Sequence, residues 1–152
     1  PVETVRTMAE IAEETERHID YAKRFRTNEF VIHDRVDAIS HATCGMAIDI
    51  GAKVIVVTSM SGMTVRMVSR FRAPTDIVGM ATNKRVWYKL SLSWGVLPVL
   101  SEQFNSTDVL FYHALRAARD TMHLQPGDNV VMTGGITNGK SGNTNLIKIE
   151  AV

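Results

Sequence analysis

The sequence predicts a three-layer α/β domain, in which helices cover both faces of a wound, mostly parallel five-stranded sheet. Short apolar segments rich in β-branched residues alternate along the chain with longer segments that carry an apolar residue at every third or fourth position. The first pattern is typical of buried parallel strands and the second of amphipathic helices. Strands that alternate with helices pair in parallel, because each helix returns the chain to the same end of the sheet.

Length and composition limit the class of protein. The 152 residues suffice for one domain with a buried core, and a net charge of +1 leaves no basic surface for nucleic acid. The single cysteine, Cys44, excludes an intrachain disulfide and a cysteine-based zinc site, which fits a reducing cytoplasm. No segment approaches the roughly 20 apolar residues of a membrane-spanning helix, and no signal peptide is visible. We therefore expect a cytoplasmic protein that binds neither membranes nor nucleic acid.

The N-terminal segment is expected to form an amphipathic helix with one apolar stripe, because apolar residues recur every three or four positions among many charged ones. The partner of this stripe need not be in this chain. Residues 21–32 lose the periodicity and carry many charges, which predicts a loop or an interdomain connection. The chain opens on Pro1, directly in the helical pattern, and we interpret it as a piece of a longer protein, with secretion or processing as the weaker alternative. The stripe consists of Val2, Val5, Met8, Ile11 or Ala12, and Ile19.

Four further helices are expected, each with a start or stop signal. Gly51 ends the first, and Pro74 follows the second. Thr82 or Asn83 caps the third, and the polar cluster 105–108 caps the fourth. These helices span residues 34–49, 63–71, 83–93 and 109–123.

Five strands lie between or after these helices. The first is a β-branched run, the turn at residues 126–128 leads into the fourth, and the fifth alternates apolar with polar residues. Only about a dozen irregular residues join the last two strands, too few for a helical crossover, so we expect these two to be antiparallel neighbours. The strands span residues 53–58, 76–80, 95–100, 129–133 and 145–152.

The turn between the first strand and its helix is the most informative segment of the chain. Ser59, Ser61 and Thr64 would place hydroxyl groups beside the free N–H groups of a helix N-terminus. Unsatisfied donors and the positive end of the helix dipole meet there, which suits a phosphate. The alternative is that Ser61 or Thr64 only caps the helix. Arg66 and Arg70 would border an anion in the first case and form a solvated helix face in the second.

Residues 134–141 match the Walker A pattern G-x-x-x-x-G-K-[ST], yet they do not predict a nucleoside triphosphatase. That loop needs a helix directly after it, and here an alternating strand pattern follows. The sequence also leaves no room for the later carboxylate that binds magnesium in such enzymes. The segment fits a glycine-rich lid loop in which Lys140 reaches an anion. This lid consists of Gly139, Lys140, Ser141 and Gly142.

Other residue types point to no catalytic or metal site. The five histidines lack metal-like pairing, and Asp34, Asp37 and Asp49 are spaced for capping and solvent exposure. No nucleophile–base pair or carboxylate dyad stands out. The eight methionines are interpreted as core filler instead of a peptide-binding groove.

Several segments together resemble the C-terminal part of pyruvate kinase, of bacterial type. Among them are VVTSMSGMTVRMVSRFRAP, SWGVLPV and SGNTN. The resemblance covers essentially the whole chain in order, and the combination is specific although each piece alone is weak. The matching segments are residues 1–13, 37–42, 56–74, 93–99, 126–128 and 141–145.

The resemblance implies a regulatory domain with a five-stranded α/β sheet that binds allosteric effectors and forms one interface of a homotetramer. Residues 1–20 resemble the last helix of the preceding catalytic barrel domain, and residues 21–152 the C-terminal domain itself. The catalytic lysine and the acids that bind the metal lie in the barrel in that family. The parent enzyme would be a glycolytic phosphotransferase that uses Mg²⁺ and K⁺, whereas this chain alone is expected to hold no catalytic residue and no cofactor.

The family's effector-phosphate loop, T-x-S-G-x-S, falls on the turn described above. The exchanges of Ser for Thr and Thr for Ser keep its chemistry. Members that bind fructose 1,6-bisphosphate use a tryptophan and an arginine for the second phosphate; here no tryptophan lies between Ser101 and Leu110, and Leu110 takes the arginine position. The expected phosphate-binding residues are Ser59, Met60, Ser61, Gly62, Met63 and Thr64.

Three functions remain open at this point. The first is a regulatory and oligomerisation domain that binds a phosphorylated effector such as a sugar monophosphate or AMP. The second is a structural domain for tetramer assembly with no effector bound. The third is a stand-alone phosphate-binding protein or enzyme.

Overall fold

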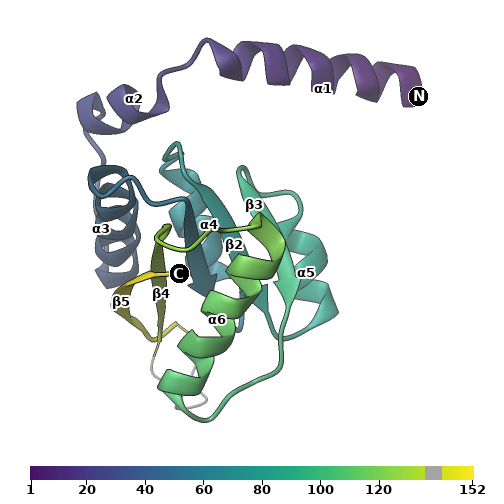
Figure 1. The fold of residues 1–152 in the computed structure, drawn as a ribbon. Coiled ribbons are helices and arrows are strands. Elements are labelled where there is room, and N and C mark those ends of the chain that lie inside the picture. The colour runs from purple at the N-terminus through teal and green to yellow at the C-terminus, as the bar shows by residue number, and fades with distance from the viewer. Residues whose placement is uncertain (136–141) are drawn as a thin grey trace.

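A five-stranded sheet forms the centre of the molecule in the computed structural model (Figure 1). The structure describes residues 1–135 and 142–152. The strands lie in the order β3-β2-β1-β4-β5. β1, β2, β3 and β4 run parallel, and β5 is antiparallel to β4, which confirms the predicted fold class. The bounds are β1 Val54–Thr58, β2 Asp76–Ala81, β3 Val96–Leu100, β4 Asn129–Gly135 and β5 Thr144–Ala151.

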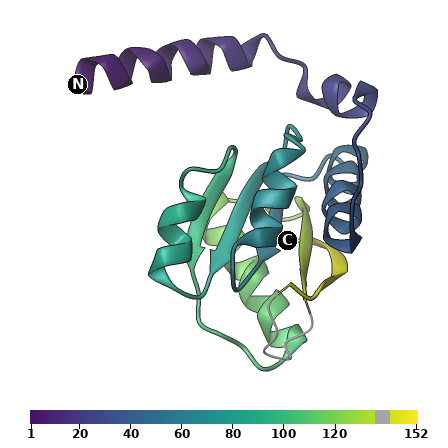
Figure 2. The ribbon, with the colours of Figure 1, turned by 180° about the vertical axis from the view of Figure 1, so that it is seen from behind.

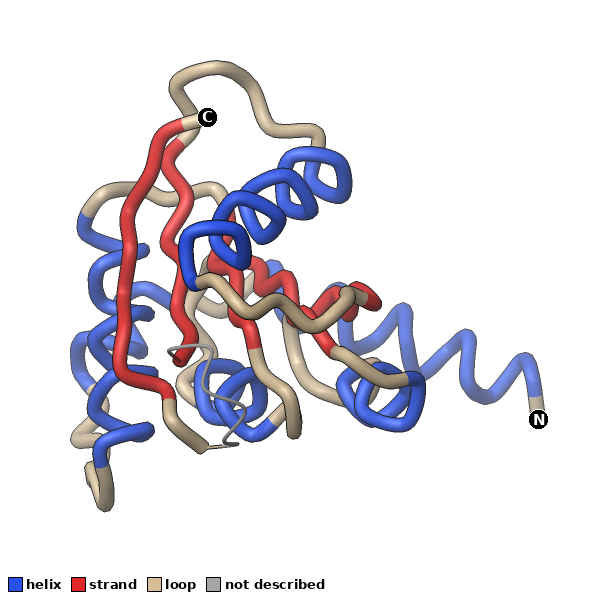
Figure 3. The backbone as a smooth tube through the Cα atoms, turned by 90° about the horizontal axis from the view of Figure 1, so that it is seen from below, coloured by secondary structure: helices blue, strands red, loops and turns tan. Residues whose placement is uncertain are grey.

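Helices cover the two faces of this sheet unequally. α3 (Arg35–Asp49), α4 (Met63–Arg70) and α5 (Lys84–Leu90) lie on one face, and α6 (Thr107–Met122) lies alone on the other (Figures 2 and 3). Alternate residues of β1 serve the two cores: Ile55 and Val57 pack with α3 and α4, and Val54 and Val56 pack with α6. All five residues of β1 are buried, as a strand covered on both faces requires.

Side-chain caps set the start of α3, α5 and α6. The Asp34 carboxylate accepts the N–H of Asp37 at 2.9 Å, and the Asn83 side chain accepts that of Val86 at 2.9 Å. Ser106, within the predicted cap cluster, accepts the N–H of Val109 at 3.5 Å. Asn83 rather than Thr82 is therefore the cap of α5. This helix ends at Leu90, earlier than expected, because residues 91–95 form a turn into β3.

The prediction of a loop over residues 21–32 is wrong in its first half. α2 (Tyr21–Thr27) is a short helix, capped by Asp20, whose side chain accepts the N–H of Lys23 at 2.9 Å. Its one buried residue, Phe25, stacks on His41 with ring centroids 4.9 Å apart and contacts Phe30 at 5.4 Å. A helix of two turns is too short to show periodicity, and tertiary packing stabilises it.

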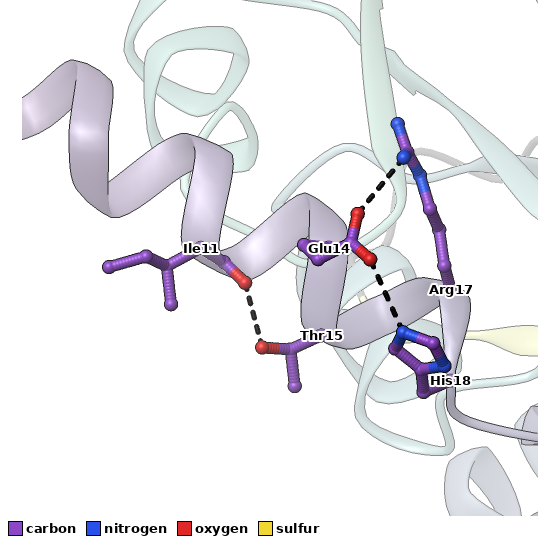
Figure 4. A network of polar contacts seen from close by, with 5 residues as sticks. All are labelled: Ile11, Glu14, Thr15, Arg17 and His18. Atoms are coloured by element: carbon purple, nitrogen blue, oxygen red, sulfur yellow. Dashed lines mark hydrogen bonds and ion pairs between the residues drawn. The ribbon is translucent and has the colours of Figure 1, made fainter.

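α1 (Val2–Arg17) confirms the expected N-terminal helix, but every one of its residues is exposed. It projects beyond one end of the strands (Figures 1 and 2). Local contacts support it: Glu14 pairs with Arg17 at 3.0 Å and with His18 at 3.2 Å (Figure 4). Its apolar stripe, Val2, Val5, Met8 and Ile11, is 61–69% exposed.

Close packing of β2 against α4 and β3 predicts the effect of a single methyl group. A Cβ at Gly79 would lie 2.9 Å from Val65 Cγ1 of α4 and 3.1 Å from Val96 Cγ1. We expect Gly79→Ala to lower the free energy of unfolding by about 1–3 kcal/mol, because overpacking displaces these side chains. Denaturant unfolding with Gly45→Ala as the matched control measures this. Gly45 lies within α3 with Phe25 Cε1 at 3.9 Å from the added Cβ, so this change should stabilise by up to about 1 kcal/mol. Equal stability of the Gly79→Ala and native proteins would contradict the packing described.

Candidate functional site

The loop after β1 lies at the switch point of the sheet. β1 is followed in the chain by β2 on one side, whereas β4, which comes later, pairs with its other side. The path of the chain therefore diverges here: from β1 it continues through α4 to β2 on one side, and it returns through α6, on the other face, to β4. In open α/β sheets, ligands bind in the crevice that this divergence leaves. The predicted phosphate-binding residues 59–64 occupy the β1 side of that position.

Gly62 gives the loop its shape. Its φ of 74° places it in the left-handed region at the N-cap of α4, a conformation that favours glycine. An added Cβ would also lie 2.9 Å from Val86 Cγ1 and 3.2 Å from Leu90 Cδ2 of α5. The backbone at Gly62 thus packs directly on the neighbouring helix, and α4 starts with its N–H groups directed toward the loop.

The other loop residues differ in what they offer a ligand. Met60, Ser61 and Met63 are exposed. Ser59 is half-buried, and its N–H donates to the carbonyl of Met80 at 3.2 Å, which leaves only its side chain for another partner. The Ser61 hydroxyl accepts the N–H of Met63 at 3.4 Å, a long contact that a stronger acceptor would replace.

Thr64 lies differently from what the sequence suggested. It is 3% exposed, and its Oγ1 shares a hydrogen bond of 2.6 Å with Oγ1 of Thr144 at the start of β5. Its hydroxyl therefore links the loop to β5 instead of standing free beside Ser59 and Ser61. The backbone N–H of Thr64, in the first turn of α4, faces no intrahelical acceptor.

Residues at the end of β4 form a second wall that the sequence analysis did not assign to the site. Thr58 Oγ1 donates to the carbonyl of Thr133 at 3.4 Å, and Thr133 Oγ1 donates to that of Leu146 at 2.9 Å. A Cβ on Gly134 would collide with Thr58 Oγ1, so only glycine fits there. The glycine pair after a buried strand was the signal in the sequence for this close approach.

Arg66 and Arg70, the two arginines that could border an anion, have different roles. Arg70 lies 3.2 Å from the buried carboxylate of Asp37, and its guanidinium is 4.9 Å from the ring centre of Phe71. Arg66 is exposed in the first turn of α4, where its NH2 group contacts Met63 Sδ at 3.5 Å. Arg66 is thus a cation next to the loop, and Arg70 stabilises the fold.

Most of the predicted lid cannot be placed, because Gly139, Lys140 and Ser141 lie outside the described residues. Gly142 is described, with a φ of 80°, and Thr144 follows it into β5. The Walker A reading requires a helix at this point, and a strand is found. None of the helices within residues 1–135 and 142–152 has the length and apolar character needed to cross a bilayer.

A hollow of about 430 Å³ lies between α6 and the end of β3. Met80 connects it with the loop, because its side chain lines the hollow and its carbonyl holds Ser59. The stacked rings of Phe104 and His113, 4.4 Å apart, form one side. Leu110, one turn earlier on α6, is half-buried and offers no hydrogen-bond donor.

The Thr64–Thr144 pair predicts a double-mutant cycle. Thr64→Val alone should destabilise the protein by about 1–3 kcal/mol, because the buried Thr144 hydroxyl loses its partner. Thr144→Val should do the same in reverse. The double variant should cost clearly less than the sum of the two, since no unpaired hydroxyl remains. Chemical denaturation of the four proteins measures the coupling, and simple additivity would show that the two hydroxyls do not depend on each other.

Comparison with known proteins assigns this geometry to a family. The family model described as "Pyruvate kinase, alpha/beta domain" matches residues 37–150. Pyruvate kinase of Clostridium acetobutylicum is 37% identical over 155 residues, covering 100% of this chain and 32% of that protein. The enzymes of Lactobacillus delbrueckii subsp. bulgaricus and Staphylococcus saprophyticus subsp. saprophyticus are 32% and 33% identical, with 100% of this chain and 26% of each relative covered.

The chain thus spans between a quarter and a third of the length of these relatives. The match includes β1 and its loop, α4, and the β4–β5 pair, which are the elements that form the site. The sheet order and the antiparallel last strand agree with the α/β description of the family. The chain belongs to the pyruvate kinase family and comprises its α/β domain.

Proposed function

We propose that this chain is the regulatory and oligomerisation domain of a pyruvate kinase and that it binds a phosphorylated effector in the loop 59–64. The observation that carries the proposal is the position of this loop: it opens α4 at the switch point of the sheet. A phosphate group there would meet helix N–H groups, the exposed Ser61 hydroxyl and the side chain of Arg66.

The groups available favour a ligand with one phosphate. Ser61 would exchange its long contact to Met63 for a hydrogen bond with the phosphate, which frees the Met63 N–H for a second one. Ser59 would add its hydroxyl. A second phosphate would find no donor at Leu110, so a sugar monophosphate or a nucleoside monophosphate such as AMP fits better than fructose 1,6-bisphosphate.

The apolar stripe of α1 supports a second part of the proposal. Val2, Val5, Met8 and Ile11 are exposed along one helix, which is costly unless another surface covers them. We assign residues 1–20 to the catalytic barrel domain of the same parent protein, and residues 21–152 to the regulatory domain. Catalysis of phosphotransfer, together with the Mg²⁺ and K⁺ it needs, belongs to the barrel. The parent would act in the glycolytic pathway of the cytoplasm.

Edge strand β5 is the surface we assign to self-association. Within the described residues β5 pairs with β4 and lies at the edge of the sheet, and an edge strand can pair with a second copy. Ile149 on this strand is 47% exposed. In the parent, the same contact would form one interface of a homotetramer. A purely structural role in assembly is the alternative, and the Ser61–Met63 contact is what favours it, since it satisfies a helix N–H without a ligand.

Binding measurements test the phosphate loop. By calorimetry with AMP, ribose 5-phosphate, inorganic phosphate and fructose 1,6-bisphosphate, we expect the monophosphates to bind and the bisphosphate to gain little. Ser61→Ala should weaken binding by roughly tenfold or more, because a hydrogen bond to a charged group is lost. Ser59→Ala should act in the same direction. Ser91→Ala, an exposed serine outside the loop, is the control. If Ser59→Ala and Ser61→Ala leave all affinities unchanged, the serines are only caps.

Sedimentation tests the β5 interface. We expect the chain to form dimers at high concentration, and Ile149→Lys to raise the dissociation constant by roughly tenfold, because like charges would meet across the two-fold axis. Leu92→Lys is the matched control: Leu92 is 91% exposed and lies between α5 and β3, at the opposite side of the sheet. A strict monomer, or equal weakening by both substitutions, would count against β5 as the interface.

A further inference from the structure

Trp94, just before β3, contacts two regions of the chain that are distant from it in sequence, residues 16–21 and residues 69–72. Its Nε1–H donates to Oε1 of Glu16, the penultimate residue of α1, at 2.7 Å. Its ring lies 4.9 Å from that of Tyr21, the first residue of α2. Its carbonyl accepts the hydroxyl of Ser69 in α4 at 2.6 Å. The Trp94–Glu16 hydrogen bond joins α1 to the sheet domain.

The local backbone is arranged to make these contacts. Arg72 adopts a φ of 48°, which is uncommon for a residue with a Cβ, and its guanidinium lies 5.5 Å from the ring centre of Trp94. Gly95, with a φ of 65°, turns the chain from Trp94 into β3. A strained arginine beside a tryptophan that binds a separate helix indicates a built contact.

α4 carries this contact back to the candidate phosphate site. The helix begins at Met63, directly after the loop, and its last turn holds Ser69 and Arg70. Ser69 bonds Trp94, and Arg70 bonds the carboxylate of Asp37 in α3. One short helix therefore has the loop at its N-terminus and the Trp94 contact at its C-terminus.

We propose that Trp94 is a positioning residue that clamps α1 in one orientation relative to the sheet domain. The domain that packs on the apolar stripe of α1 is thereby held in the same orientation. The partner on the stripe rests on the proposed function: it is the barrel domain of the same parent protein. The clamp itself is a property of this chain. The Glu16 carboxylate and the indole N–H set the direction of α1, and the ring contacts to Tyr21 and Arg72 hold the indole in place.

Double electron–electron resonance, which measures the distance between two spin labels, tests the clamp in this chain without any ligand. One label is attached at Thr7→Cys on α1 and the other at Arg119→Cys on α6, both exposed positions. Cys44 need not be replaced, because it is buried and desolvation raises the pKa of its thiol to about 12, which keeps it protonated and unreactive. The native protein should give one narrow distance distribution.

Trp94→Phe removes the N–H donor but keeps a ring. It should lower the ratio of molecules in which α1 is clamped to molecules in which α1 is released by roughly fivefold, which broadens the distance distribution. Trp87→Phe is the matched control, because its Nε1–H donates to the carbonyl of Pro98 at 2.8 Å, away from α1. Glu16→Ala should act like Trp94→Phe, and Glu16→Gln, which retains an acceptor oxygen, should largely preserve the narrow distribution. Thermal unfolding confirms that the variants are folded.

A broad distribution in the native protein would overturn the clamp. So would distributions for Trp94→Phe and Glu16→Ala as narrow as that for Trp87→Phe. Since no phosphate ligand takes part, failure here leaves the binding proposal for the loop untouched, and failure of the calorimetry leaves the clamp untouched.

Discussion

The burial of β1 on both faces is the constraint on which the rest of the structure depends. Val54 and Val56 meet the core under α6, and Ile55 and Val57 meet the core under α3 and α4. A central strand of this kind must be apolar throughout, and polar residues can return only where the strand ends. That end coincides with the point where the chain turns toward β2 while β4 lies on the other side. The polar loop 59–64 and the switch point are therefore consequences of one arrangement.

Unequal cover of the sheet accounts for several other features. Three helices share one face, whereas α6 lies alone on the other, and a single helix about 10 Å wide cannot cover five strands spaced about 4.8 Å apart. The hollow beside β3 lies where α6 leaves the strand uncovered. At the other edge of the sheet, Lys148 and Glu150 of β5 form an ion pair with a distance of 2.8 Å. Open edges and hollows thus follow from the number of helices, independently of any ligand.

α4 is the element through which the two ends of the domain meet. Its N-terminus is shaped by Gly62, which packs on α5, and its C-terminus is held by Ser69 and Arg70. Because Arg70 is paired with the buried Asp37, Arg66 is the arginine of α4 whose charge is available to the loop. The division of these two arginines depends on α3, which brings Asp37 under α4. Two arginines one helical turn apart would have the same spacing whether they bordered an anion or paired with a carboxylate, so the spacing alone does not separate these roles.

The amino-acid sequence by itself determined the strands, the helices other than α2, the wound sheet and the position of the polar loop, because periodicity and helix start and stop signals are local properties. α2 escaped prediction, since two turns show no period and Phe25 is held by His41 and Phe30. Only the tertiary structure decided that Thr64 faces Thr144, 80 residues later, that Gly134 must leave room for Thr58, and that Trp94 reaches Glu16. The reason is physical: the direction of a side chain along one element is local, but its partner is chosen by packing with elements far away in the chain.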